Sequence, residues 1–516
     1  GSGTSPLHSV RAGPPPLLPR SLSANITHAN SAHLLGKKVI NVSNDQAPDT
    51  KPLTRRDFLK ASGAAALGLF AAPSLLSAQP APVASEDYFL AIQTHAHDYF
   101  FEGGDQACAD MREKGGFNAM LMAATYVSES KWRGHQPGND YEVNAGAYFN
   151  FDPAFYQSSG IRPVRAEAEG MEDYDALDAA SKGARKAGIQ IYAWLSDYDQ
   201  RETARLYPEC KVYGPDQKPD PDTTWFCLNN PQAQAFTLAF YQDIATNYDV
   251  DGFFVDRIRT PGAVGYCFCP FCKQKMSDMG LDADHLFEVM ADVYTRKANL
   301  PHYQMLLWLG VALDPVFYFP ELPEIVAWQG VRMQSVTEHV ARVKEAVGVI
   351  NPNLKIGLDL WETSSAVSVG QNMGPLSFHC DWIKPMLYHQ SAARDMVREP
   401  VNAYVEQSGG QYTHQQVYDA LFRPFWLARG VRLPDSWDTF VAEGMPAQWL
   451  VNEAVLAMSL VEERVPIYPG IQGWEPATIE QIWTMLDAAF NQAKAPGITT
   501  YCWSEITWDK IATYKR

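Results

Sequence analysis

Short apolar runs alternate with longer amphipathic segments along this chain from Asp87 onward. The runs are rich in β-branched and aromatic residues, which is typical of buried parallel strands. The longer segments, clearest at 174–187, 231–248 and 328–349, repeat apolar residues at intervals of three and four, as helices packed on one face do. We count eight strand-like runs between such helical segments: 89–94, 117–125, 189–195, 252–256, 354–360, 381–388, 466–472 and 497–503.

Eight repeated β/α units predict an α/β fold, a single (β/α)8 TIM barrel with long βα-loop insertions over residues 84–516. Long excursions fall at 126–172, 197–226, 257–327 and 390–464, and the last of these reads as a helical insert. Most of them leave the C-terminal ends of strands, where enzymes of this fold carry their active sites. We therefore expect the functional side chains at those strand ends.

The composition supports one large folded body. The chain has 516 residues, of which 46% are hydrophobic and 20% charged, so it can bury a sizeable core and is not a disordered protein. The formal net charge is −17; residues 1–60 hold eight Lys and Arg against three Asp and Glu, which leaves −22 for residues 61–516. Such an acidic body repels phosphate backbones and disfavours nucleic acid as a partner.

The first 83 residues differ from the rest. Residues 1–53 are rich in Pro, Ser and Asn without periodicity, and we interpret them as an expression-tag or disordered leader. Residues 54–83 resemble a twin-arginine signal peptide, because Arg55-Arg56 and Phe58-Leu59-Lys60 precede an uncharged Ala- and Gly-rich stretch. The resemblance implies export by the bacterial twin-arginine machinery, a periplasmic or secreted protein, and no stable membrane span in the mature form.

Several segments resemble the hypothetical glycosyl hydrolase families of the α-amylase-like barrel superfamily. The most specific match is 248–259 (YDVDGFFVDRIR), and 187–194, 227–231, 351–360 and 381–388 match further strands in order, so that the resemblance covers roughly 88–510. It implies a glycoside hydrolase that acts on an oligo- or polysaccharide. The chain departs from the family pattern in the insert at 390–464 and in His95-Ala96-His97 at the first strand.

Glycoside hydrolysis needs two carboxyl groups, one to protonate the leaving oxygen and one to attack the sugar or activate water. Asp256 ends the fourth predicted strand, and the resemblance implies that it is the nucleophile or base. Arg257 and Arg259 follow it, and their charge would keep Asp256 ionised. For the acid, the superfamily's fifth-strand Glu favours Glu362, whereas Asp359 aligns better with the family pattern, and both stay open.

Aromatic rings stack on sugar faces, and polar side chains donate hydrogen bonds to hydroxyl groups. Several such residues fall at or just beyond the predicted strand ends, and we expect them to bind substrate, although core packing would explain any single ring. The set is His95, His97, Trp132, His135, Trp194, Arg257, Arg259, Trp361, Lys384, Tyr388, His389, Gln472, Trp474, Trp503 and Glu505.

Three cysteines, Cys267, Cys269 and Cys272, form a C-x-C-x-x-C run in the loop after the fourth strand. Three thiolates at this spacing, with a fourth from elsewhere, suit a tetrahedral structural zinc. The run resembles the structural zinc loop of family 42 β-galactosidases. Cys227 is the expected fourth ligand and Cys210 the alternative. Disulfides compete with zinc, because the final compartment of an exported protein is oxidising.

Two other functions compete with a glycosidase. His95 and His97 could form the first-strand metal pair of a metal-dependent amidohydrolase-type enzyme, although the remaining predicted strand ends lack that superfamily's other ligands. The chain could also be a non-catalytic carbohydrate-binding barrel, because a fold does not fix a function. Loss of glycan turnover in Asp256→Asn, with binding retained, would separate catalysis from binding.

Overall fold

The computed structural model describes residues 88–127, 130–133, 135, 140–166, 170–214, 216–261, 267–299 and 323–515. All of them belong to one unit of the chain, residues 79–516. The predicted leader at 1–53 and signal peptide at 54–83 lie outside the described residues. Among the described helices, none combines the length and apolarity that crossing a membrane requires.

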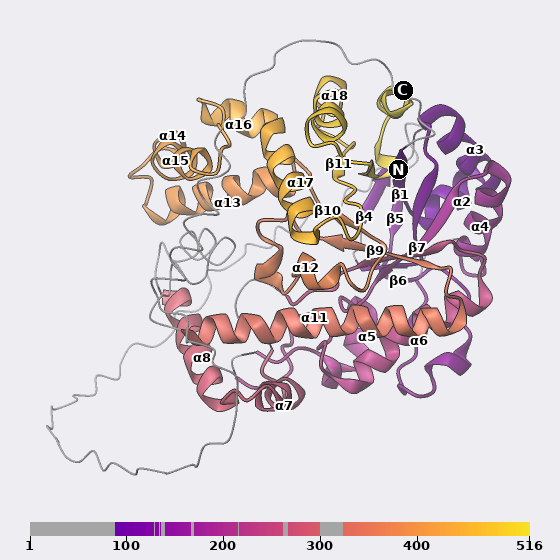
Figure 1. The fold of residues 1–516 in the computed structure, drawn as a ribbon, viewed down its shortest axis with the longest axis horizontal. Coiled ribbons are helices and arrows are strands. Elements are labelled where there is room, and N and C mark those ends of the chain that lie inside the picture. Colours follow the sequence, from indigo (N-terminus) through magenta and orange to yellow (C-terminus); the bar gives the residue numbers. More distant parts are fainter. Residues whose placement is uncertain are drawn as a thin grey trace, which may run out of the picture. The chain divides into compact units, whose positions relative to one another are not determined.

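Eight strands form one parallel sheet in the order β10-β9-β8-β7-β2-β1-β12-β11 (Figure 1). The sheet closes between its two edge strands, because Ile383 N donates to Pro466 O at 3.1 Å and Leu387 N donates to Gly470 O at 3.0 Å. The predicted TIM barrel is therefore confirmed. The strands are β1 (Phe89–Thr94), β2 (Ala119–Ala123), β7 (Gln190–Ser196), β8 (Gly252–Asp256), β9 (Lys355–Leu360), β10 (Trp382–Pro385), β11 (Gly470–Gln472) and β12 (Gly497–Tyr501).

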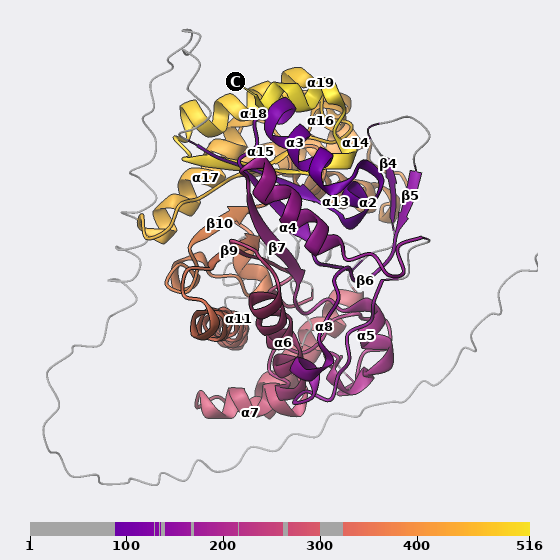
Figure 2. The same ribbon diagram turned by 90° about the vertical axis from the view of Figure 1, so that its right-hand side faces the viewer.

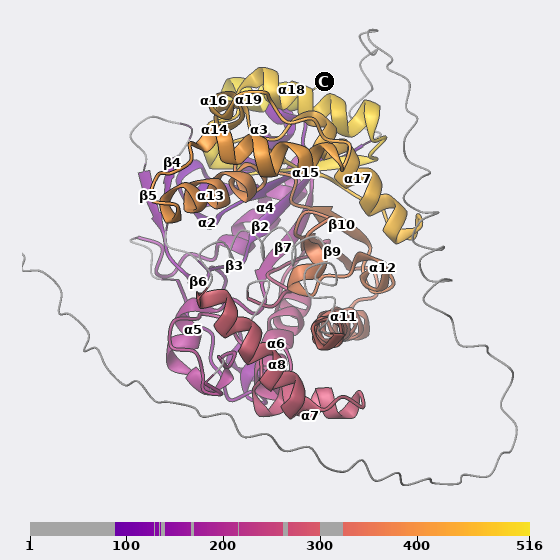
Figure 3. The same ribbon diagram turned by 90° about the vertical axis from the view of Figure 1, so that its left-hand side faces the viewer.

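Helices cover the outside of the barrel, with α3 and α18 on one side and α6 and α11 on the opposite side (Figures 2 and 3). Local sequence sets their starts: the Asn230 side chain accepts hydrogen bonds from the first-turn amides of α6, and Pro231 occupies its first position. These and the neighbouring helices are α2 (Ala96–Glu102), α3 (Gly104–Gly115), α4 (Ala176–Ala187), α6 (Pro231–Asn247), α11 (Pro323–Ile350), α18 (Ile479–Asp487) and α19 (Trp508–Ile511).

The βα-excursions carry most of the remaining elements. Two small antiparallel pairs, β3 (Thr125–Tyr126) with β6 (Gly146–Ala147) and β4 (Ser130–Arg133) with β5 (Asp140–Val143), follow β2. The other helices are α5 (Arg201–Leu206), α7 (Pro270–Asp278), α8 (Ala283–Asn299), α12 (Met373–Leu376), α13 (Ala392–Gln407), α14 (His414–Val417), α15 (Arg423–Leu427), α16 (Trp437–Glu443) and α17 (Ala447–Val461). The last five lie within 390–464.

Several predicted strands are longer than the observed ones. The run at 466–472 pairs as a strand only over Gly470–Gln472, because Pro466 and Pro469 have no N–H for a continuous ladder. The run at 117–125 ends at Ala123, and Thr125 turns away to pair with Ala147 of β6. These differences change strand ends and leave the order of the eight units as predicted.

Large rings fill the interior of the barrel. Trp382 stacks on Phe254 with ring centroids 5.4 Å apart and also packs against Phe89 and Tyr192. The neighbouring strand makes room for it with Gly357, where a Cβ would lie 2.0 Å from the Trp382 ring. Close packing of the barrel interior therefore depends on the absence of a side chain at Gly357, which leaves space for the Trp382 ring.

This pairing predicts that Gly357→Ala destabilises the protein by about 1–3 kcal/mol, because the added methyl group must displace the Trp382 ring. Urea unfolding followed by circular dichroism measures the change. Gly348→Ala is the control: it lies within α11 with no atom within 4 Å of the added Cβ, and should raise stability by about 0.5–1 kcal/mol. Equal stability in the two variants would contradict the packing described.

Candidate active site

Asp256 lies at the C-terminal end of β8 and is 6% exposed. Its carboxylate accepts hydrogen bonds from the indole Nε1 of Trp194 at 3.2 Å and from the backbone N–H of Arg257 at 2.6 Å. Arg257 itself adopts a positive φ of 59°, a left-handed conformation uncommon for a residue with a side chain. The chain therefore turns sharply at the strand end and fixes the Asp256 side chain from two directions.

Two guanidinium groups flank Asp256. Arg259 NH1 lies 3.6 Å from Asp256 Oδ1, and Arg257 Nε lies 3.8 Å from Oδ2. Arg257 also donates to Asp199 at 2.7 Å. Arg259 lies over the rings of Trp225 and Trp361, and burial together with Arg257 lowers its pKa to about 10.

Asp359, near the end of β9, pairs with a buried lysine. Lys384 Nζ lies 3.0 Å from Asp359 Oδ1 and 3.1 Å from Oδ2. The same ammonium donates to Gln93 of β1 at 3.0 Å and contacts Tyr388 Oη at 2.5 Å. Burial raises the pKa of Asp359 to about 7, although Lys384 opposes the shift, and Asp256 adds to it. The Lys384 ammonium and the Asp359 carboxyl group therefore hold each other in place, and Gln93 and Tyr388 also fix the ammonium.

Glu362 follows β9 and is 4% exposed. Its carboxyl group accepts one side-chain hydrogen bond, from Ser365 Oγ at 3.0 Å. Burial raises its pKa to about 7, Glu453 raises it further, and Ser365 and Arg259 oppose the shift. Arg259 thus acts electrostatically on both Asp256 and Glu362. A carboxyl group that stays protonated near neutral pH can donate a proton.

Aromatic rings from several strands surround these groups. Trp194 packs edge-on against His95 at 5.3 Å, Tyr126 at 5.9 Å and Tyr501 at 6.2 Å. Trp474 packs against Tyr501 at 5.2 Å and against Tyr388 at 4.9 Å, and these two tyrosine rings are 6.4 Å apart. The rings of Trp361, Trp474, Tyr126 and Tyr501 are half-buried and therefore reach solvent. Sequence reasoning did not single out Tyr126 or Tyr501.

Three predicted residues lie in a second cluster beside α2. Trp503 is fully buried, donates from its indole Nε1 to Glu102 at 3.0 Å and packs against His135. His135 stacks on Trp508 at 4.1 Å, and burial lowers its pKa to about 4. His97 packs against other rings of this region, and its own ring is 5.8 Å from that of Tyr148.

The remaining predicted residues are placed as follows. Gln472 accepts from the Gln390 amide at 3.0 Å, and His389 is fully buried with its pKa lowered to about 4 by burial and by Arg394. Glu505 is half-buried; burial raises the pKa of Asp98, and Glu102 and Glu505 add to the shift. The side chain of Trp132, in β4, lies outside the described part of the structure.

A buried polar network beneath Asp256 was not predicted. Asp197 directly follows β7, and its amide donates to Asp256 O at 3.0 Å. Its carboxylate accepts from Tyr241 Oη at 2.6 Å and contacts His339 Nε2 at 2.6 Å. The network ties α6 and α11 to the ends of β7 and β8. Its signal in the sequence is a histidine among Val336, Val340 and Val343 on the apolar face of α11.

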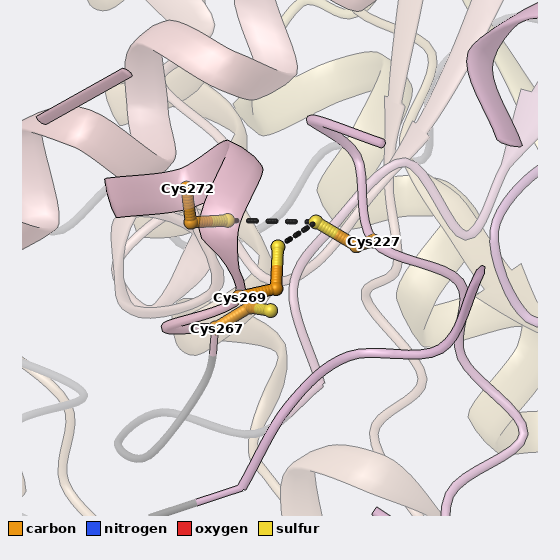
Figure 4. Close-up of side chains that lie close together, drawn as sticks. All are labelled: Cys227, Cys267, Cys269 and Cys272. Atoms are coloured by element: carbon orange, nitrogen blue, oxygen red, sulfur yellow. Dashed lines mark hydrogen bonds between the residues drawn. The ribbon is translucent and has the colours of Figure 1, made fainter. Parts of the chain in front are cut away.

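Four buried cysteines meet beside α7 (Figure 4). Cys227 Sγ lies 3.5 Å from Cys269 Sγ and 3.4 Å from Cys272 Sγ, and all four sulfurs, including that of Cys267, lie within 4.8 Å of one another. A tetrahedral zinc site with Zn–S bonds of about 2.3 Å places its sulfurs about 3.8 Å apart. The cluster can therefore hold a metal ion.

The chemistry around the sulfurs also fits thiolate ligands. The Tyr213 amide donates to Cys267 Sγ at 3.1 Å, and Asn229 Nδ2 donates to Cys272 Sγ at 3.3 Å. All eight cysteines are free thiols. Cys210, the alternative ligand, instead contacts Gln232 and is not part of the group. Among the described residues this is the one group of three or more His, Cys, Asp or Glu side chains arranged for a metal, and His95 and His97 belong to no such group.

No family model and no curated protein matches the chain. Among solved structures, the chain is similar to the PgaB (BpsB) glycoside hydrolase domain from Bordetella bronchiseptica, with 12% identity over 80% of this chain and 94% of that one and a TM-score of 0.48. It is also similar to a β-galactosidase from the Antarctic haloarchaeon Halorubrum lacusprofundi (12% identity, 83% of this chain and 57% of that one, TM-score 0.47).

A third similar structure is α-L-fucosidase isoenzyme 2 from Paenibacillus thiaminolyticus, with 13% identity over 83% of this chain and 48% of that one and a TM-score of 0.44. The chain thus spans nearly all of the first domain and about half the length of the two other enzymes. All three are named as glycoside-cleaving enzymes.

The buried state of Glu362 predicts a pH-dependent stability. Its pKa rises from 4.5 in the unfolded chain to about 7 in the folded protein, so the free energy of unfolding falls as pH rises through this interval and levels off above it. The glutamine in Glu362→Gln cannot ionise, so this variant should lack the fall in the free energy of unfolding that Glu362 causes. Between pH 4.5 and pH 8, unfolding of this variant should gain up to about 3 kcal/mol relative to the unsubstituted protein.

Urea unfolding at the two pH values measures this difference. Glu406→Gln, on the exposed face of α13, is the matched control and should show none. A pH-independent difference for Glu362→Gln would mean that Glu362 ionises normally in the folded protein.

Proposed function

We propose that this protein is a glycoside hydrolase that acts on an oligo- or polysaccharide, with Asp256 as nucleophile or base and Glu362 as acid. One observation carries the proposal: two buried carboxyl groups at the ends of adjacent strands differ in their partners. Asp256 has guanidinium groups of Arg257 and Arg259 at 3.8 and 3.6 Å, whereas Glu362 accepts a side-chain hydrogen bond from the Ser365 hydroxyl, and burial raises its pKa to about 7. Two carboxyl groups kept in different protonation states are what glycoside cleavage requires.

The proposed reaction divides the work between the two strands. Glu362 donates its proton to the glycosidic oxygen as the bond to the leaving sugar breaks, and Asp256 either attacks the anomeric carbon or removes a proton from the attacking water. Arg259 lies 3.6 Å from Asp256 and also acts on Glu362, where its charge favours the ionised form and so works against the raised pKa. The carboxyl separation will determine retention or inversion of configuration.

Asp359 is the alternative acid, since its pKa is also raised to about 7. Its close pairing with Lys384 favours a different role, because a carboxyl group that accepts from an ammonium at 3.0 Å is stabilised as the anion. In that role Asp359 and Lys384 orient sugar hydroxyl groups. The half-buried rings of Trp361, Trp474 and Tyr501 offer faces for sugar stacking.

Two substrates of one sugar, a natural glycoside and an aryl glycoside with an acidic phenol as leaving group, separate these roles. Asp256→Asn should lower kcat by at least about 10³-fold on both, because the step at the anomeric carbon is lost. Glu362→Gln should lower kcat by about 10²–10⁴-fold on the natural glycoside and far less on the aryl glycoside, whose leaving group needs no proton. Asp178→Asn, at a half-exposed position of the outer helix α4, is the control and should leave both rates unchanged.

Other results would redirect the assignment. If Asp359→Asn shows the leaving-group dependence and Glu362→Gln does not, Asp359 is the acid. Glycan binding without turnover in the unsubstituted protein would favour a carbohydrate-binding barrel. Hydrolysis of an amide that requires added metal and is lost in His95→Ala would favour an amidohydrolase-type enzyme.

We also propose that Cys227, Cys267, Cys269 and Cys272 hold a structural zinc ion. Four thiolates leave no open coordination position, so the ion would stabilise the fold and take no part in catalysis. The cluster joins the segment that precedes α6 to the loop that begins at Asp256, because Cys227 comes from the first and the other three from the second. The ion would thereby fix the far end of the loop that carries Arg257 and Arg259.

Metal analysis of the purified protein tests this proposal. We expect about one zinc per chain, lost in Cys272→Ser with a lower Tm, and retained in Cys210→Ser, whose buried thiol lies outside the cluster. Titration of the denatured, unreduced protein should then find all eight thiols. Four or more thiols missing, with no bound metal, would show that the cluster forms disulfides.

A further inference from the structure

The helical segment 390–464 contributes one carboxyl group to the surroundings of Glu362. Helix α17 buries a stripe of small and apolar residues that includes Leu450, Ala454, Ala457 and Val461. Glu453 lies in the same stripe and is only 5% exposed. Acidic residues are rarely buried on the apolar face of a helix unless a partner requires them there.

Both partners of Glu453 belong to the short segment that follows Glu362. The Glu453 carboxylate accepts the backbone N–H of Ser364 at 2.8 Å, and the Glu453 carbonyl oxygen accepts the Thr363 hydroxyl at 2.9 Å. Helix α17 lies beside α12, which follows this segment in the chain (Figures 1 and 3). Two hydrogen bonds from one residue therefore fix the two residues directly after Glu362.

We propose that Glu453 is a positioning residue that holds Glu362 in place and keeps it protonated near neutral pH, so that the helical segment 390–464 completes the active site. The inference rests on the proposed function in giving Glu362 the role of acid. It assigns to α17 a task in the reaction, although none of its side chains needs to touch the substrate.

The charges that face Glu362 support this role. Burial, the largest effect, and the charge of Glu453 favour the protonated form, whereas a hydrogen bond from the backbone of Glu362 itself, the hydroxyl of Ser365 and the guanidinium of Arg259 favour the ionised form. Without Glu453, a buried carboxyl group beside Arg259 would lose its proton more easily. Glu453 supplies negative charge that opposes Arg259 at Glu362.

Glu453 itself can carry the charge that this role needs. Its pKa is raised by burial, but the Ser364 amide hydrogen bond and Arg429 both favour its ionised form. The Glu362 carboxyl group receives only the Ser365 hydroxyl hydrogen bond from a side chain. Hydrogen bonds and positive charge that act on a carboxylate favour its ionised form. Glu453 thus holds the charge and Glu362 the proton.

Carboxyl-selective ¹³C NMR titration of the full chain tests the proposal without turnover. The Glu362 signal is assigned by its absence in Glu362→Gln. In Glu453→Gln, which keeps an acceptor for the Ser364 amide, we expect the Glu362 titration to move down by about one pH unit. Thr363→Val removes a hydrogen bond to Glu453 without changing charge and should leave the titration in place, as should exposed Glu406→Gln.

The activity profile provides the second measurement. The basic limb of kcat/KM against pH should move down by the same amount in Glu453→Gln. If Glu453→Gln does not fold, Glu453→Asp, whose shorter side chain withdraws the charge from Glu362, should give a smaller shift in the same direction. An unmoved Glu362 titration in the folded variant overturns the proposal, even in an active enzyme. A shifted titration in a protein that cleaves no glycan supports the coupling and contradicts only the glycosidase function.

Discussion

The rest of the site depends on one interaction, the ion pair between the ammonium group of Lys384 and the carboxyl group of Asp359 inside the barrel. Lys384 is fully buried, and an unpaired charge there would cost several kcal/mol. Asp359 and Gln93 offset this cost, and they draw the C-terminal parts of β1, β9 and β10 together. The C-terminal end of β9 is therefore fixed in position, and so is the start of the segment after it, which carries Glu362.

The outer elements extend this fixed frame to the two proposed catalytic groups. Helix α11 places His339 against Asp197 below Asp256, and its Arg332 binds both Thr260 and the Ser368 carbonyl. Loops after β8 and β9 are thus tied to one helix. Helix α17 fixes the segment after Glu362 from the other direction. These contacts hold Asp256 and Glu362 in different charge environments on neighbouring strands. Asp256 lies beside Arg257 and Arg259, whereas burial is the largest influence on Glu362.

The sequence predicts the barrel and the position of Asp256 because both rest on local patterns, eight apolar runs and a carboxylate at a strand end. Trp503 shows where such reasoning fails. The predicted strand 497–503 places Trp503 at its end, beside the site. Instead β12 ends at Tyr501, the chain enters a short 3-10 helix, and Trp503 packs against His135. Glu453 stands out in an apolar stripe, yet its partner is over 80 residues away in the chain, and only the folded structure identifies it.

A crystal structure of the Asp256→Asn variant with an oligosaccharide from a polysaccharide that the unsubstituted protein cleaves tests the central claim most directly. The account predicts that the sugar chain crosses the ends of β8 and β9, with the anomeric carbon facing residue 256 and the glycosidic oxygen within hydrogen-bond distance of Glu362. A sugar bound elsewhere, or one whose glycosidic oxygen contacts neither Glu362 nor Asp359, would contradict it.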